Sequence, residues 1–141
     1  MRTISNPELA GHLRLVIVRT ARRLRQESGV ELSPSLTAAL STVDRHGPLT
    51  PSELAARERI QRPTATRVLA RLEEMGLIVR TPDPQDRRSS LVAPTPAARE
   101  LLDELRTRKT AFLAERIEGL GADERAVLDR AADILERMLA E

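Results

Sequence analysis

Three times in this chain of 141 residues, a Ser-Pro or Thr-Pro pair precedes a stretch with helical spacing of apolar residues. The pairs are Ser33-Pro34, Thr50-Pro51 and Thr95-Pro96. A serine or threonine before a helix accepts a hydrogen bond from a free backbone N–H. Proline fits the first helical position because its φ is fixed and it has no N–H to satisfy. The pairs therefore predict helices that begin near these three positions. A glutamate three residues after Thr50 predicts a capping box there.

Apolar periodicity and glycine stops extend this prediction to the whole chain. The expected order is helix, helix, short helix, helix, hairpin, long helix and helix. The expected helices are 6–28, 33–46, 52–59, 64–75, 96–118 and 123–139, and the expected strands are 77–80 and 90–92. Two short helices joined by a tight turn and followed by a hairpin form a winged helix-turn-helix. The predicted fold class is mainly α with a small β-hairpin wing.

The same pattern divides the chain into three parts. Residues 33–93 form the expected winged helix-turn-helix domain, which is large enough to fold alone. Residues 1–32 and 94–141 contribute long helices with broad apolar faces and no evident partner inside so small a domain. We expect these terminal helices to bury their apolar faces against each other and against a second copy of the chain.

Composition excludes several kinds of site. Without cysteine the chain has no disulfide, thiolate zinc site, cysteine nucleophile or thiol sensor. Phe112 is its one aromatic residue, which argues against nucleic-acid binding by stacking of bases on aromatic rings. Its two histidines are too few for a histidine-only metal site. The longest apolar run, residues 15–18, is far shorter than the roughly 20 residues of a membrane span. With no apolar signal core at the start, we expect a cytoplasmic protein without cofactor or membrane partner.

Charge is distributed unevenly, although the net charge is only +2. Residues 1–52 and 53–99 each carry +3, whereas residues 100–141 carry −4. A basic front and an acidic tail indicate a polyanion-binding segment followed by a segment with another task.

The densest basic segment covers residues 57–71, with five arginines against Glu58 alone. It includes the second helix of the pair, the element that enters the major groove in helix-turn-helix proteins. Arginine can bond guanine O6 and N7 together, and alanine or a threonine methyl can contact the thymine methyl. The candidate DNA-binding residues on this helix are Arg62, Thr64, Ala65, Thr66, Arg67 and Arg71. The alternative interpretation is a solvated charged face.

The turn of the predicted hairpin adds Asp86, Arg87 and Arg88 to the candidate DNA-binding residues. Arginine at a wing tip can enter the minor groove, where narrow A·T-rich stretches deepen the negative potential. The adjacent aspartate can hold such a guanidinium by a forked hydrogen bond. A solvated turn with an internal ion pair is the alternative.

Enzymatic interpretations have little support. Neighbouring carboxylates such as Glu73 and Glu74 point in different directions on a helix, and neither histidine lies in a nucleophile or metal motif. We therefore expect no catalytic residues. The competing class is a winged-helix module that binds protein and does not read DNA sequence, which the acidic last helix favours.

Three stretches resemble the MarR family of bacterial winged-helix transcriptional regulators. They are LTPSELA at 49–55, RPTATRVL at 62–69 and RLEEMGLI at 71–78. Residues 83–89, DPQDRRS, look like that family's Asp-x-Arg wing signature, and the usual threonine follows at Thr95. The likeness is most specific over residues 49–95, and the helix order fits the whole chain.

The resemblance implies a homodimer whose terminal helices interlock and whose two winged domains read a pseudo-palindromic operator. Most members repress by covering a promoter. The family's groove-facing positions fall on Thr64, Thr66 and Arg67, and its minor-groove arginine falls on Arg88, with Asp86 as its brace.

Many members of the family release DNA when a small, often phenolic, anion binds between the dimer helices and the winged domain. Here that geometry implies a small-molecule effector site near His12, Leu13 and Ile17. One departure lies at the turn between the two short helices, where Glu58-Arg59 replaces the family's common Leu-Gly pair. A positive φ at Arg59 would cost on the order of 1 kcal/mol, so we expect a reshaped turn.

Overall fold

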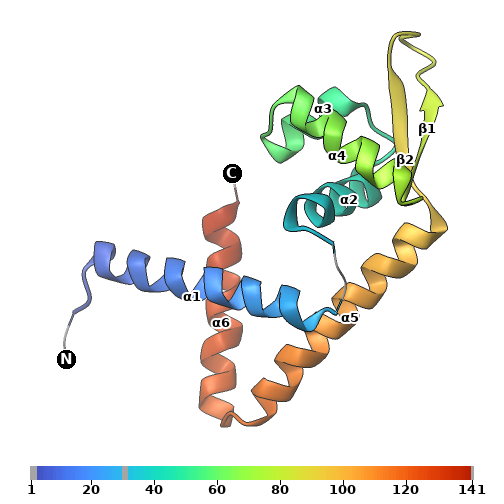
Figure 1. Ribbon diagram of the computed structural model, residues 1–141. Helices are drawn as coiled ribbons and strands as arrows, with labels where there is room; N and C mark the ends of the chain where they lie inside the picture. Colours follow the sequence, from blue (N-terminus) through green and yellow to red (C-terminus); the bar gives the residue numbers. More distant parts are fainter. Residues whose placement is uncertain (1–2, 30–31, 141) are drawn as a thin grey trace.

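The computed structural model describes residues 3–29 and 32–140, which form six helices and one β-hairpin (Figure 1). In chain order the elements are α1 (Asn6–Glu27), α2 (Pro34–His46), α3 (Pro51–Glu58), α4 (Arg62–Glu74), β1 (Ile78–Pro82), β2 (Ser90–Pro94), α5 (Pro96–Glu118) and α6 (Ala122–Leu139). The mainly α class, the order of elements and the single hairpin agree with the prediction.

The Ser-Pro and Thr-Pro pairs cap their helices as predicted. Ser33, Thr50 and Thr95 precede α2, α3 and α5, and each side chain accepts the backbone N–H three residues later at 3.2 Å. The capping box predicted at Thr50 forms only in part, because the Glu53 carboxylate accepts the Thr50 hydroxyl at 3.2 Å. A complete capping box stands instead at Ser5, before α1.

One core joins α2, α3, α4, the hairpin and the first half of α5. Its large, fully buried side chains are Leu40, Val43, Leu49, Leu54, Leu69, Leu72, Ile78, Val92 and Leu102. We call residues 32–105, which enclose this core, the winged unit. Because α5 supplies Ala98, Leu102 and Leu105, the packing continues past residue 93, where the sequence predicts the domain to end. The domain limits themselves stay a prediction.

The wing is an antiparallel pair in which Ile78 lies opposite Pro94 and Pro82 lies opposite Ser90. Leu49, two residues before α3, exchanges two backbone hydrogen bonds with Val92, at 3.1 and 2.8 Å. This additional rung ties the middle of β2 to the start of α3. The orientation of the wing is thereby linked to that of the two short helices.

The turn between α3 and α4 keeps the left-handed conformation, so the predicted reshaping is wrong. Arg59 has φ 54° and ψ 44°, and the next N–H, of Ile60, donates to Ala55 O at 3.0 Å. Glu58 is half-buried, and its carboxylate accepts the hydroxyl of Thr42 on α2. The contact with α2 and the backbone bonds hold the turn, and Arg59 bears the steric cost that glycine would avoid.

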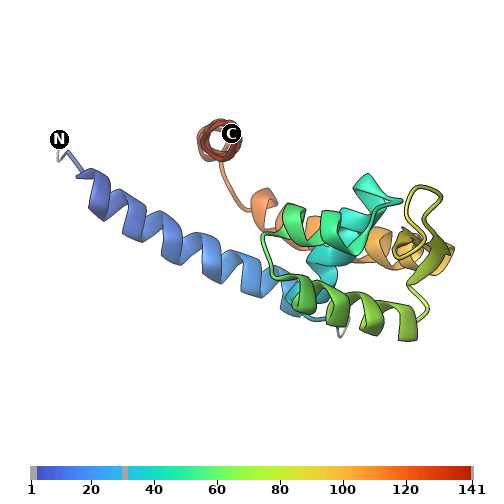
Figure 2. The ribbon, with the colours of Figure 1, turned by 90° about the horizontal axis from the view of Figure 1, so that it is seen from above.

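The terminal helices extend beyond the winged unit. In Figures 1 and 2, α1 projects from the unit as a long arm and α6 folds back from the far end of α5. The anchor of α1 is at its C-terminal end, where Arg108 of α5 donates to Ser28 O at 2.8 Å and Phe112 lies 5.3 Å below the guanidinium of Arg23. Neither α1 nor α6 has a buried residue.

No helix in the described part of the chain is long and apolar enough to cross a membrane.

Candidate nucleic-acid interface

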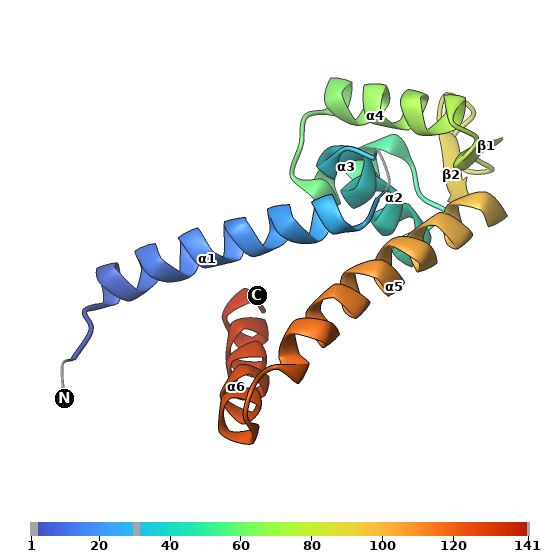
Figure 3. The same ribbon diagram turned by 60° about the horizontal axis from the view of Figure 1, so that its bottom comes forward.

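α4 runs along the outer edge of the winged unit, with α2 and α3 on its inner side (Figure 3). Its apolar side faces the core through Ala65, Leu69 and Leu72. Its opposite side exposes Arg62, Thr66, Arg67 and Arg71. A helix of 13 residues that lies on the outside and carries basic side chains toward solvent has the form of a recognition helix.

Ala65 faces the core, so the structure contradicts the DNA contact predicted for its side chain. Its accessible fraction is 0%, as are those of Leu69 and Leu72. Residues four and seven positions apart share one side of a helix, so Ala65 belongs to the inward face. Its small side chain lets α4 approach the core closely. Thr64, beside it, is half-buried and lies at the edge of the outward face.

The three arginines on the outward face of α4 have different partners. Arg62 Nη1 donates to Ser52 Oγ of α3 at 2.6 Å, and Arg67 Nη2 donates to Thr64 Oγ1 at 3.3 Å. Arg71 Nη1 instead forms an ion pair with Glu74 Oε2 at 3.2 Å. Arg62 and Arg67 are therefore hydrogen-bonded to neutral hydroxyl groups, whereas the charge of Arg71 is offset by a carboxylate.

Two further features at the start of α4 suit contact with nucleic acid. The hydroxyl of Thr66 donates to Arg62 O at 3.0 Å, so its methyl group is the part available for an apolar contact. The N-cap residue Gln61 makes no side-chain capping bond. Backbone N–H groups at such a helix start can bind a phosphate oxygen.

The wing tip exposes Arg87 and Arg88 on a turn held by aspartate. Asp86 Oδ1 accepts the backbone N–H of Arg88 at 3.0 Å, and Asp83 Oδ1 accepts that of Gln85 at the same distance. The sequence predicts that Asp86 holds the guanidinium of Arg88. In this structure Asp86 holds the backbone of Arg88 instead, so it shapes the turn and leaves the guanidinium exposed.

The sequence gives no signal for two contacts that orient this surface. One is the bond from Arg62 to Ser52, ten residues apart on different helices. The other is the ion pair of Arg80 on β1 with Glu73 on α4, at 3.3 Å, which links the wing to the recognition helix. Neither spacing falls within one helix turn, so no local pattern signals these pairs.

The three predicted effector residues do not line one cavity in the described chain. Leu13 lines an apolar cavity of about 410 Å³ between α1 and α6, together with Ile134, Leu135 and Met138. His12 lines a separate hollow of about 300 Å³ with Ile4 and Glu8. Ile17, one turn further along α1, is 47% exposed.

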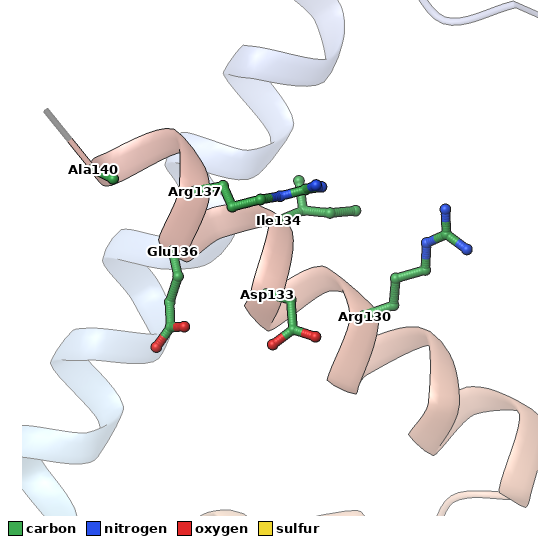
Figure 4. A pocket seen from close by; sticks show the side chains of 6 residues that line it. All are labelled: Arg130, Asp133, Ile134, Glu136, Arg137 and Ala140. Atoms are coloured by element: carbon green, nitrogen blue, oxygen red, sulfur yellow. The ribbon is translucent and has the colours of Figure 1, made fainter.

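A hollow of about 670 Å³ runs along the second half of α6, and Figure 4 shows its charged side chains. Arg130 points away from Asp133 and Glu136, so these groups do not converge on a common point. Within residues 3–29 and 32–140, no group of three His, Asp or Glu side chains is placed to hold a metal ion. Exposed basic side chains stand on the outward face of α4 and on the wing tip.

Comparison with known proteins agrees with this geometry. Residues 32–90 match the MarR family model. An uncharacterised helix-turn-helix-type transcriptional regulator of Mycobacterium leprae is 39% identical over 140 residues, which cover 97% of this chain and 96% of that protein.

Solved structures share the fold along its whole length. A candidate transcriptional regulator of Pseudomonas aeruginosa superposes with a TM-score of 0.87 at 34% identity, covering 99% of this chain and 100% of that one. Streptococcus pneumoniae FabT in complex with DNA has a TM-score of 0.73 at 20% identity, covering 96% and 97%. This chain belongs to the MarR family of winged helix-turn-helix transcriptional regulators.

Proposed function

We propose that the protein is a homodimeric repressor that binds a pseudo-palindromic operator through α4 and the wing. The observation that carries the proposal is the outward face of α4, where Arg62 and Arg67 are held by hydroxyl groups and not by carboxylates. A repressor needs such a face to bind DNA over a promoter. FabT, which has the same fold, has been solved in complex with DNA.

Base contacts are assigned to the middle of the exposed face. We assign Arg67 to a guanine edge and the methyl of Thr66 to a thymine methyl. Arg88 on the exposed wing tip is assigned to the minor groove beside the half-site. Arg87 and Arg71 supply phosphate contacts, and Arg71 contributes less because Glu74 offsets its charge.

The homodimer is supported by the apolar surface of the terminal helices. Val127, Met138 and Leu139 of α6 are 66%, 65% and 82% exposed. Monomeric soluble proteins rarely leave contiguous apolar surface of this kind in water. A two-fold dimer would bury it and would place two α4 helices about one DNA turn apart, centre to centre. A regulator acting on bacterial DNA in this way would work in the cytoplasm.

Release by a small-molecule effector completes the proposal. Leu13 lines the apolar cavity between α1 and α6, and His12, the residue before it, lines the neighbouring hollow. Because α1 is anchored near the winged unit, a ligand that moves α1 would alter the spacing of the two α4 helices.

Selection from a random duplex library with the purified protein, at near-physiological salt, tests the proposal. We expect enrichment of a symmetric motif whose half-sites lie one helical turn apart. Retention of DNA without a motif would reduce the protein to a binder of charge alone. Failure to retain DNA would favour the alternative, a winged-helix module that binds protein.

A further inference from the structure

Ser52 lies on the first turn of α3, and its hydroxyl accepts a hydrogen bond from a guanidinium of the next helix. Arg62 Nη1 is 2.6 Å from Ser52 Oγ, and both side chains are exposed. The distance is short for a nitrogen donor and an oxygen acceptor. This contact joins the beginning of α3 to the beginning of α4, so it fixes the direction of a side chain that would otherwise be free to rotate.

The choice of partner matters, because a hydroxyl orients a guanidinium without neutralising it. In the described chain Arg23, Arg71, Arg80, Arg99, Arg106 and Arg108 all form ion pairs with carboxylates. Arg62 and Arg67 are hydrogen-bonded instead to the hydroxyls of Ser52 and Thr64. The exposed side of α4 therefore carries two oriented cations that form no ion pair with a carboxylate of the described residues.

The position of Arg62 favours a phosphate over a base. As the first residue of α4, it lies next to the helix start, where Gln61 makes no side-chain capping bond. The positive end of the helix dipole and the uncapped N–H groups act there together with the guanidinium. The bond to Ser52 draws the guanidinium back toward α3, away from the following turns of α4 that carry Thr66 and Arg67.

We propose that Ser52 is a positioning residue for DNA binding, whose hydroxyl holds the Arg62 guanidinium at the start of α4 to bind one backbone phosphate. The inference rests on the proposed DNA-binding function. Ser52 does not contact the phosphate itself. It acts through Arg62, because a preorganised guanidinium loses less side-chain freedom when it binds.

The test is a double-mutant cycle on the duplex that the wild-type protein selects, with affinity measured across a salt series. Ser52→Ala is expected to weaken binding between about 2- and 10-fold, the range of one modest hydrogen bond. Ser52→Thr is expected to restore it, because threonine keeps the hydroxyl. Arg62→Ala is expected to weaken binding for all sequences alike and to lower the salt slope by about 1.

The coupling energy between Ser52 and Arg62 tests whether the two residues act together. We expect Ser52→Ala to have no further effect in a chain that already carries Arg62→Ala. Additive losses would show that Ser52 contacts DNA by itself and would overturn the proposal. Equal affinity of Ser52→Ala and the wild type would overturn it as well.

Ser35→Ala is the matched control. Ser35 occupies the same position in α2 as Ser52 in α3, directly after the proline that follows a Ser or Thr cap. We expect Ser35→Ala to leave affinity unchanged, and thermal unfolding of each variant separates positioning from stability. If Ser35→Ala weakens binding as much as Ser52→Ala, the specific role of Ser52 is refuted. If the wild type binds no DNA, the proposed function fails, and this inference fails with it.

Discussion

The winged unit and the two terminal helices share one sequence pattern, helical spacing of apolar residues, and differ in what covers those residues. In the winged unit, Leu40 of α2, Leu54 of α3, and Leu69 and Leu72 of α4 all have accessible fractions of 0%. In α1 and α6 no residue is buried. The spacing of apolar residues alone indicates that one face of each helix must be covered. Whether the covering surface lies in the same chain depends on how many elements can converge around it.

The geometry explains the difference. Three helices, a hairpin and the first half of α5 surround one centre in the winged unit. By contrast, α1 and α6 lie outside the winged unit (Figure 1), and no side chain of either helix is buried. A single long helix offers one apolar stripe and needs a partner of similar length. Two predictions test the packing of the apolar faces, and two test the polar face of α4 and the turn before it.

Leu128→Glu is expected to have the largest effect, because Leu128 of α6 is 49% exposed and a two-fold dimer that covers it loses the contact twice. Covering the exposed half of one leucine contributes about 0.8–1.5 kcal/mol, and an unpaired buried carboxylate in its place costs at least about 1–3 kcal/mol, so over two copies dimerisation should weaken by about 4 kcal/mol or more. Sedimentation equilibrium measures the change, and Asp129→Ala, at the adjacent exposed position, is the control. A Leu128→Glu protein that sediments as the wild-type dimer would show that this part of α6 is not covered by a second copy.

Leu69→Ala is expected to lower the free energy of unfolding by about 2–5 kcal/mol, because Leu69 is fully buried between α4 and the core. Urea denaturation at several protein concentrations measures it. The loss should be the same at each concentration, whereas that of Leu128→Glu should depend on concentration. A concentration-dependent loss for Leu69→Ala would contradict the view that the winged unit closes its core within one chain.

Arg67→Ala is expected to weaken operator binding by about 1–3 kcal/mol and to relax the base preference at one position per half-site. Arg71→Ala is the matched comparison one turn along α4, and we expect a smaller loss because Glu74 already offsets its charge. Binding to the selected duplex and to its single-base variants measures both. Uniform weakening by Arg67→Ala across all sequences would assign Arg67 to phosphate.

Arg59→Gly is expected to have the smallest effect, raising the free energy of unfolding by up to about 1 kcal/mol. Glycine adopts φ 54° without the steric cost that an arginine bears. Arg57→Gly, inside α3, is the control and should lower stability by about 1 kcal/mol. Thermal or urea unfolding measures both, and a loss of stability for Arg59→Gly would mean that the arginine side chain outweighs the strain of the turn.

Much of the interface could be predicted, because helix caps and turns depend on near neighbours. The caps at Ser33, Thr50 and Thr95 form between residues three apart, and the basic segment of α4 was visible as composition. The error at Ala65 came from treating consecutive residues as one surface. The phase of a helix relative to its core decides which of them face outward, and Ala65 shares the inward phase of Leu69.

By itself, the sequence determined where the helices begin, the order of the elements and the family to which the chain belongs. These features rest on bonds and patterns that close within a few residues. The tertiary structure alone decided that Arg62 is held by Ser52 and that Glu58, beside the left-handed Arg59, is held by Thr42 of α2. Both contacts depend on helices packed side by side, and composition and periodicity do not carry that geometry.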